Sequence, residues 1–271
     1  MIDRASPSLW RRAWPPALAG LAGVASLPLV ILPTLEALMG AGRSPTHSLA
    51  LLAILSLIQP ALLVIVAAFV GAALAPGLGF TSYLAGVNVR ETFVAHVRGA
   101  LASGLVAGAV IVALDVALFR HFTLQPIGAA PGRRILHALV GGVLYGGLSE
   151  EVMLRFGLLT LVVWLGVRIA TRKTARASSE ETPEATRTAI PAPLNVIAIV
   201  VVALVFAAGH LPAASAIAPL TAEVVLRILL LNAVAGLVFG WLYWKASLEA
   251  AMLAHATVHV VFAIAQYLGW G

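Results

Sequence analysis

The sequence predicts an all-α, polytopic integral membrane protein, and two observations lead to this fold class. Of its 271 residues, 61% are hydrophobic and only 10% are charged, and the mean hydropathy is +1.01. Soluble domains carry roughly 25% charged residues, so no soluble core could bury this much apolar sequence. The apolar residues also form long runs, and a helix needs about 20 of them to cross a bilayer. We therefore expect one membrane domain, residues 1–271, forming a helical bundle of about seven or eight transmembrane helices.

The first part of the chain, residues 1–130, shows apolar runs without recognisable chemistry. Spans are expected at about 14–39, 48–75 and 99–119, and Pro76, Gly77 and Gly79 end the second of them. The segment 80–96 has a mixed character and is interpreted as an interfacial helix or a re-entrant piece. Asp115, near the end of the third span, is interpreted as an interfacial carboxylate. The role of these N-terminal spans is not legible from the residues.

The next segment, from Arg133 and Arg134 to about Ala170, is too long for one straight crossing. At 1.5 Å per residue it would reach more than about 50 Å, against a hydrocarbon core of about 30 Å. We expect it to bend, to break near Gly157 or to form two spans, and this leaves the number of spans at seven or eight. Gly142 and Gly146 have the GxxxG spacing that lets a neighbouring helix approach closely.

Three charged residues stand in the middle of this apolar segment: Glu150, Glu151 and Arg155. Charges near a bilayer centre are costly, so they face a protein interior or a wet cavity and indicate a functional site. Glu151 and Arg155 are spaced i,i+4 with the acid first, the favourable orientation for an ion pair on a helix. Glu150 points about 100° away and has no sequence-local partner. An uncompensated carboxylate in a poorly solvated pocket is suited to general acid–base chemistry.

A polar loop at about 171–192, rich in Ser, Thr, Glu and Pro, separates this segment from three further spans. These are expected at about 194–210, 223–244 and 247–270, and they hold three histidines. His210 follows Phe206 by four residues, and His255 and His259 are also four apart, so each pair shares a helix face. Three histidines and a glutamate pair on separate spans indicate a shared polar site.

Basic residues cluster at the ends of the expected spans, where they act as topology signals and meet lipid headgroups. The formal charge of +6 therefore indicates a lipid bilayer as partner and no nucleic acid. The absence of cysteine excludes disulfides, thiolate metal sites and a cysteine nucleophile. The Ala-, Leu- and Val-rich composition favours a bacterial cytoplasmic membrane. Nothing in the sequence fixes an oligomeric state.

Three motifs now give a resemblance to a known family. Residues 150–155 match EExxxR, residues 206–210 match FxxxH, and residues 255–259 occupy the place of HxxxN. In this order they resemble the CPBP family, also called the Abi or CAAX protease family, which includes type II CAAX prenyl endopeptidases of the Rce1 kind. The Gly-rich run 236–243 before the third motif fits as well. The resemblance extends over roughly 138–263, within a core that we place at 134–270.

The resemblance implies an intramembrane glutamic endopeptidase with a catalytic cavity among the later helices and a peptide or membrane-protein substrate. Glu150 would be the general base that activates a water molecule, and His210 would assist it. His255 and the residue at position 259 would stabilise the oxyanion. Glu151 and Arg155 would orient the helix, with a less direct catalytic part for Glu151, and Phe206 would pack beside the site.

One departure from the motif leaves alternatives open, because His259 stands where the family usually has Asn. An imidazole donates or accepts depending on its tautomer, so His259 can serve an oxyanion hole if its NH faces the cavity. With His210, His255 and a glutamate such as Glu150 it also supplies the ligand types that zinc prefers. Beside the metal-free endopeptidase we therefore keep a zinc-dependent membrane hydrolase. A non-catalytic scaffold or immunity protein of the same fold is the third hypothesis.

Overall fold

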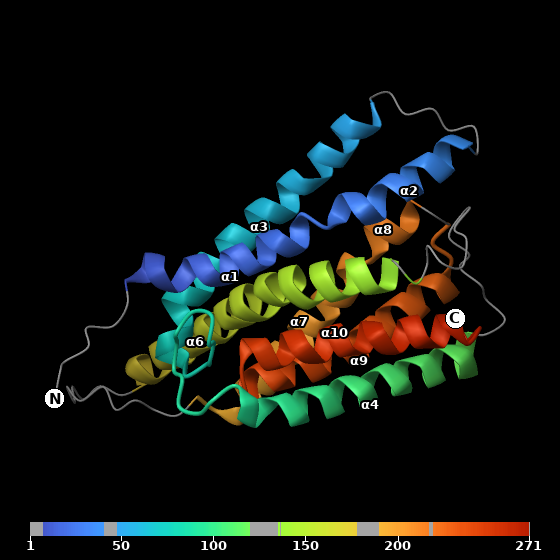
Figure 1. Ribbon diagram of the computed structural model, residues 1–271. Coiled ribbons are helices and arrows are strands. Elements are labelled where there is room, and N and C mark those ends of the chain that lie inside the picture. Colours follow the sequence, from blue (N-terminus) through green and yellow to red (C-terminus); the bar gives the residue numbers. More distant parts are fainter. Residues whose placement is uncertain are drawn as a thin grey trace.

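The computed structural model describes residues 8–40, 48–119, 135, 137–177, 190–216 and 219–270. Within these ranges the protein is a bundle of long helices (Figure 1), and the β contact found there is an isolated bridge between Ser82 and Val87. The predicted all-α fold class is confirmed. The division into residues 1–130 and a core at 134–270 stays a prediction.

Seven helical segments of the described residues are long and apolar enough to cross a membrane. The structure thus supports the lower of the two expected numbers. The spans are Leu9–Leu32, Leu49–Leu78, Val94–Phe119, Leu139–Arg172, Ala192–Ser215, Ala222–Lys245 and Leu248–Tyr267.

The first two spans comprise three helices. Helix α1 (Leu9–Val24) and helix α2 (Leu27–Gly40) follow each other with a short turn at Ala25 and Ser26, where the Ser26 hydroxyl donates to the Gly23 carbonyl. Helix α3 (Leu49–Leu78) begins with Ser48, whose Oγ accepts from the Leu51 amide. It ends at Gly79, which has a φ of 77°, a conformation that glycine adopts without steric cost.

The segment after α3 corrects one expectation, because residues 80–93 do not form an interfacial helix. They form a loop of turns, and helix α4 (Val94–Phe119) starts only at Val94. The alternative, a re-entrant piece, stays a prediction. The Asn88 amide donates to the carbonyls of Ala75, Pro76 and Phe80. These side-chain bonds satisfy the carbonyls left open at the end of α3, which favours a compact loop over a new helix.

The segment that carries the acids is continuous and does not break at Gly157. It runs as two π-helical stretches, η1 (His137–Glu150) and η2 (Val152–Leu159), and then as helix α6 (Thr160–Ala177). The i→i+5 bonding of a π-helix places more residues in each turn, so the segment gains less length per residue than an α-helix. It therefore makes one crossing, Leu139–Arg172. The predicted polar loop also starts later, because α6 extends to Ala177; residues 178–189 lie outside the described part.

The last third contains helices α7 (Ala192–Gly209), α8 (Leu211–Ser215), α9 (Ala222–Lys245) and α10 (Leu248–Tyr267). In Figure 1 the yellow-green segment of η1, η2 and α6 crosses the middle of the bundle, with α1 and α3 on one side and α4, α9 and α10 on the other. The acids of this central segment therefore lie among the helices that carry the three histidines.

Candidate active site

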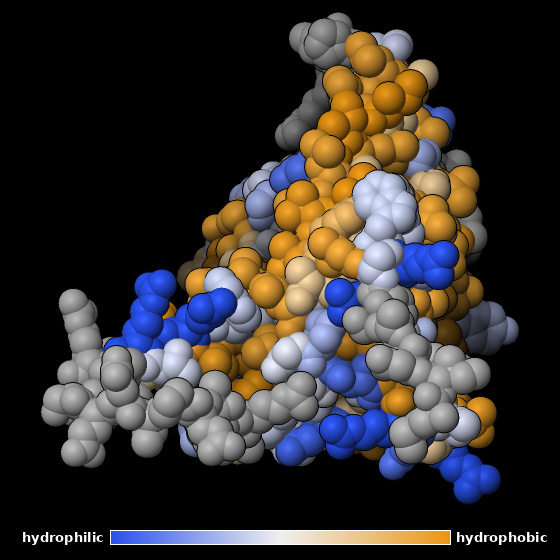
Figure 2. Space-filling model, turned by 90° about the vertical axis from the view of Figure 1, so that its left-hand side faces the viewer, coloured by the Kyte–Doolittle hydropathy of each residue, from blue (hydrophilic) through white to orange (hydrophobic). Residues whose placement is uncertain are grey.

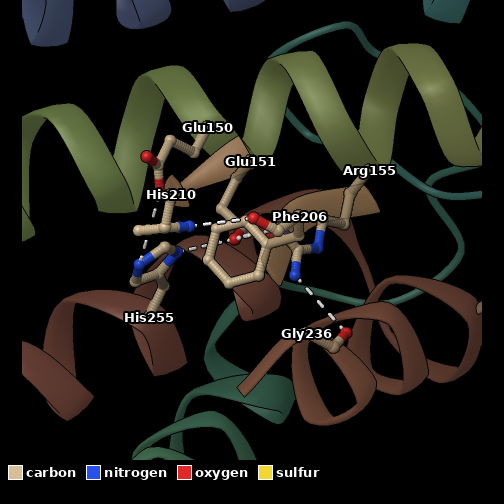
Figure 3. A network of polar contacts seen from close by, with 7 residues as sticks. All are labelled: Glu150, Glu151, Arg155, Phe206, His210, Gly236 and His255. Atoms are coloured by element: carbon tan, nitrogen blue, oxygen red, sulfur yellow. Dashed lines mark hydrogen bonds and ion pairs between the residues drawn. The ribbon is translucent and has the colours of Figure 1, made fainter. Parts of the chain in front are cut away.

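The centre of the site is the Glu151 carboxylate, which is fully buried. Its Oε1 lies 2.7 Å from Nδ1 of His255, on α10, and 3.1 Å from Nη1 of Arg155. The i,i+4 ion pair expected from the sequence is present, and His255 is a second, long-range partner that no spacing rule indicates. Glu151 therefore ties the central segment to α10 (Figure 3).

Arg155 is fully buried as well, and aromatic rings take the place of water around it. Its guanidinium carbon lies 4.9 Å from the ring centre of Phe206 and 5.2 Å from that of Phe239. Such cation–π contacts strengthen when the site is dry. Nη2 also donates to the carbonyl of Gly236 at 3.4 Å. The guanidinium is thus held by α7, α9 and Glu151 together.

The hydrogen bond to Glu151 determines how His255 presents its other nitrogen. An ionised carboxylate only accepts, so we assign the proton of the neutral ring to Nδ1. Nε2 is then unprotonated and faces Glu150, with 3.8 Å to Oε2. The imidazole is also stacked on Phe239, with ring centres 4.4 Å apart. His255 is fixed in both position and tautomer.

Glu150 differs from its neighbour in being accessible, with 17% of its side chain exposed. Its distance to His255 Nε2 exceeds that of a direct hydrogen bond and suits a contact through a water molecule. Among the described residues, no Arg or Lys lies within ion-pair distance of the Glu150 carboxylate, and the sequence likewise offered it no local partner.

His210 stands at the end of α7, where it caps the helix after Gly209. Its Nδ1 lies 2.8 Å from the Phe206 carbonyl oxygen, which holds the ring edge-on to Phe206 with centres 4.8 Å apart. Phe206 in turn lies 6.0 Å from the ring of His255. Phe206 therefore packs beside the site as expected, and it connects the two histidines. Figure 3 shows His210 on the Glu150 side of this network.

His259 lies one turn after His255, with the two rings 5.2 Å apart and nearly parallel. The glycines of η1 make room for them. A Cβ at Gly146 would lie 2.9 Å from His255 Nε2 and 3.3 Å from His259 Nε2, and one at Gly142 would overlap the His259 ring. The close approach predicted from the GxxxG spacing occurs, and the helix that approaches is α10.

The structure thus brings Glu150, Glu151, Arg155 and His255 into one network, with His210 and His259 at its borders. Among the described residues, no three His, Asp or Glu side chains converge on a common point as metal ligands do. The contributions of Gly236 and Phe239 to the Arg155 pocket were not predicted from the sequence. One feature of the sequence could have indicated them. Gly236 and Gly240 have the spacing for close helix packing, and the aromatic Phe239 stands between them.

The fold and this geometry define an integral membrane protein with a buried acid–histidine site. Residues 131–261 match the family model described as type II CAAX prenyl endopeptidase Rce1-like, and this match supports the resemblance to the CPBP family. The matched segment contains all three motifs. The family's description is that of membrane endopeptidases. No curated protein and no solved structure matches the chain significantly.

Proposed function

We propose that the protein is an intramembrane endopeptidase in which Glu150 activates the hydrolytic water. The observation that carries this proposal is the pair formed by the accessible Glu150 carboxylate and the fixed imidazole of His255, 3.8 Å apart. A water molecule bound by both would be polarised by a base on one side and held by a defined nitrogen on the other. The match of residues 131–261 to the Rce1-like family model supports a peptide bond as the substrate.

In the proposed reaction, Glu150 takes a proton from the water, and the hydroxide attacks the carbonyl carbon of the scissile bond. The carbonyl oxygen becomes an oxyanion, and the tetrahedral intermediate collapses when protonated Glu150 returns the proton to the leaving amine. His210 would help to hold the water. To donate to the oxyanion, Nε2 of His255 would take up this proton from Glu150, 3.8 Å away, and return it through Glu150 before the amine leaves. Each such donor is worth about 3 kcal/mol in hydrolases.

Glu151 is not suited to be the base, because it is fully buried and already bonded to Arg155 and His255. Its proposed part is to hold His255 and to stabilise the positive charge that His255 would carry. His259, stacked on His255, would add a second donor through its ring NH. This arrangement gives the two adjacent glutamates different tasks.

We propose that the reaction needs no metal. In support, the described residues bring no three His, Asp or Glu side chains together as ligands, and Nδ1 of His255 is bonded to Glu151. Metal analysis of the purified protein tests this. We expect substoichiometric zinc and unchanged activity after chelation, whereas one zinc per chain that disappears in a His259→Ala variant would establish the zinc hydrolase.

The proposed function itself is tested in cells by comparing the cleaved peptides of the membrane fraction. One strain carries the unchanged protein, one carries Glu150→Gln, and one carries Glu36→Gln as a control on α2, far along the chain from the motifs. We expect a set of peptides that is lost with Glu150→Gln and kept with Glu36→Gln. Identical peptide sets in all three strains, with equal protein levels, would favour the non-catalytic scaffold or immunity protein. We place the protein in a bacterial cytoplasmic membrane, on the composition described above.

A further inference from the structure

A groove on the lipid-facing surface lies between α4 and α9, away from the acid–histidine site. It has a volume of about 570 Å³, and its lining is almost wholly apolar. The floor contains the buried Ala107 and Leu242, and the walls contain exposed side chains such as Val106 and Trp241. The complete lining is Ala102, Ser103, Val106, Ala107, Val110, Val234, Leu237, Val238, Trp241 and Leu242.

The groove exists because each of the two helices packs tightly against a different neighbour. On α4, Gly104 and Gly108 lie against α10, where added Cβ atoms would meet Ala254, Thr257 and Val261 within 3 Å. On α9, Gly236 and Gly240 lie against α7 in the same way. The remaining faces of α4 and α9 meet through small and branched residues instead, so a space remains between them.

The two ends of the groove differ in charge. Beyond Val110 and Val234, Asp115 of α4 and Arg227 of α9 form a two-pronged ion pair with bonds of 2.5 and 2.6 Å. The Arg227 guanidinium is therefore already occupied by a carboxylate of its own protein.

At the other end, both lining stripes continue into exposed cations. Arg98 precedes Ala102 by one turn on α4, and Lys245 follows Trp241 by one turn on α9. The Lys245 ammonium lies 5.2 Å from the ring centre of Trp241 and 3.7 Å from that of Trp244. Neither cation has a carboxylate within ion-pair distance among the described residues. Tryptophan and basic residues together mark the level of the lipid headgroups.

From this geometry we infer a binding site for one anionic phospholipid, with an acyl chain in the α4–α9 groove and its phosphate between Arg98 and Lys245. The groove from Ala102 to Val110 is about 12 Å long at 1.5 Å per residue, which fits one leaflet of a core about 30 Å thick. Figure 2 shows the end of the molecule where α4 begins, with hydrophilic side chains gathered there beside hydrophobic surface. The site is independent of any peptidase activity.

Native mass spectrometry of the detergent-solubilised protein tests the site with phosphatidylglycerol and phosphatidylcholine that carry the same acyl chains. Each basic residue near an anionic lipid contributes about fivefold in affinity. We expect one phosphatidylglycerol per chain, preferred about thirtyfold, and a loss of this preference in the double variant Arg98→Gln, Lys245→Gln. The control Arg172→Gln, an exposed cation at the end of α6, keeps it. Equal binding of the two lipids, or an unchanged preference in the double variant, would refute the site.

A second pair of variants tests the groove itself rather than the charges. Ala102→Trp fills the groove from an exposed position, and Leu105→Trp places the same side chain on α4 at a lipid-facing position outside the lining. We expect Ala102→Trp to abolish the phosphatidylglycerol adduct and Leu105→Trp to retain it. Retention in both variants would show that the cations bind headgroups without the groove, and the inferred site would be wrong.

Discussion

At the scale of single residues, the two adjacent glutamates occupy opposite environments. The Glu151 side chain is completely buried between Arg155 and His255, while 17% of the Glu150 side chain remains accessible. The Glu151 carboxylate is therefore part of the protein's internal packing, whereas the Glu150 carboxylate can meet a substrate or a water molecule. Stability and chemistry are divided between neighbours in the sequence.

This division predicts different effects for the same amide substitution at the two positions. Glu150→Gln should lower peptidase activity by about 10²- to 10⁴-fold, the usual contribution of a general base, with a melting temperature close to that of the unchanged protein. Glu151→Gln should lower activity too, but it also leaves the buried Arg155 without its counter-charge. Breaking a buried ion pair costs about 3–5 kcal/mol. Thermal unfolding in detergent and peptide cleavage, measured on the same preparations, check both effects.

Two outcomes of these measurements would contradict the roles assigned to Glu150 and Glu151. If Glu151→Gln keeps the melting temperature and loses only activity, Glu151 acts in the chemistry and the assignment of the base to Glu150 is in question. If Glu150→Gln unfolds the protein at lower temperature, its role is structural.

The glycines that face the histidines give a second prediction at this scale. In Gly146→Ala the new Cβ would lie 2.9 Å from His255 Nε2, the nitrogen that faces Glu150. The ring must shift, and we expect an activity loss of at least about tenfold, since small displacements of catalytic groups are costly. Gly147→Ala is the matched control, because its nearest neighbour would be 3.4 Å away. Equal activities of the two variants, in a peptide-cleavage assay, would contradict this role of Gly146.

Whether a contact of the site could be predicted depends on how far apart its two residues lie in the sequence. Spacing along one helix indicated the pair of Glu151 and Arg155 and the shared face of His255 and His259. The bond between Glu151 and His255 joins residues 104 positions apart, and the pattern of a single sequence contains no register between two such helices. The motifs suggested a shared site, while the partner of each nitrogen depended on the fold.

At the scale of elements, the central segment shows why its length was misleading. Its 34 residues exceed one α-helical crossing, and a break at Gly157 was a reasonable expectation. In the structure Gly157 instead lies against Ala67 of α3, where a Cβ would come within 3 Å of the neighbouring backbone. The glycine serves packing, and the π-helical turns accommodate the length. A sequence pattern predicts which residues of a helix are apolar. It does not specify whether the backbone hydrogen bonds follow the α-helical or the π-helical pattern.

Close packing through glycine also gives a prediction for α4. Gly104→Ala would place a Cβ 2.6 Å from the Ala254 carbonyl oxygen and from the Thr257 Cβ of α10, and such overpacking costs about 1–3 kcal/mol. Gly99→Ala, on the same helix, meets nothing within 4 Å and should stabilise the helix by up to about 1 kcal/mol. Melting temperatures of both variants in the same detergent check the sign of each effect. A stable Gly104→Ala variant would show that α4 and α10 can separate without cost.

At the scale of the whole molecule, seven crossings fix which loops share a side of the membrane. The starts of α1 and α4 and the ends of α6 and α9 fall on one side, and six described basic residues near span ends lie there: Arg11, Arg12, Arg98, Arg168, Arg172 and Lys245. Arg227, near the start of α9, lies toward the other side and is paired with Asp115. Basic residues favour the cytoplasmic side. The loop between α8 and α9 and the end of α10 then face the opposite side.

The absence of cysteine makes this topology directly testable with single-cysteine variants and a membrane-impermeant maleimide. In sealed right-side-out vesicles, Arg90→Cys and Arg172→Cys should both stay unlabelled, because one crossing by α4 and one by the central segment return the chain to the same side. Leu220→Cys and Leu268→Cys, at exposed positions, should both react, and permeabilised vesicles should label all four. If the central segment crossed twice, Arg90→Cys and Arg172→Cys would differ in labelling, and the seven-span arrangement would be wrong.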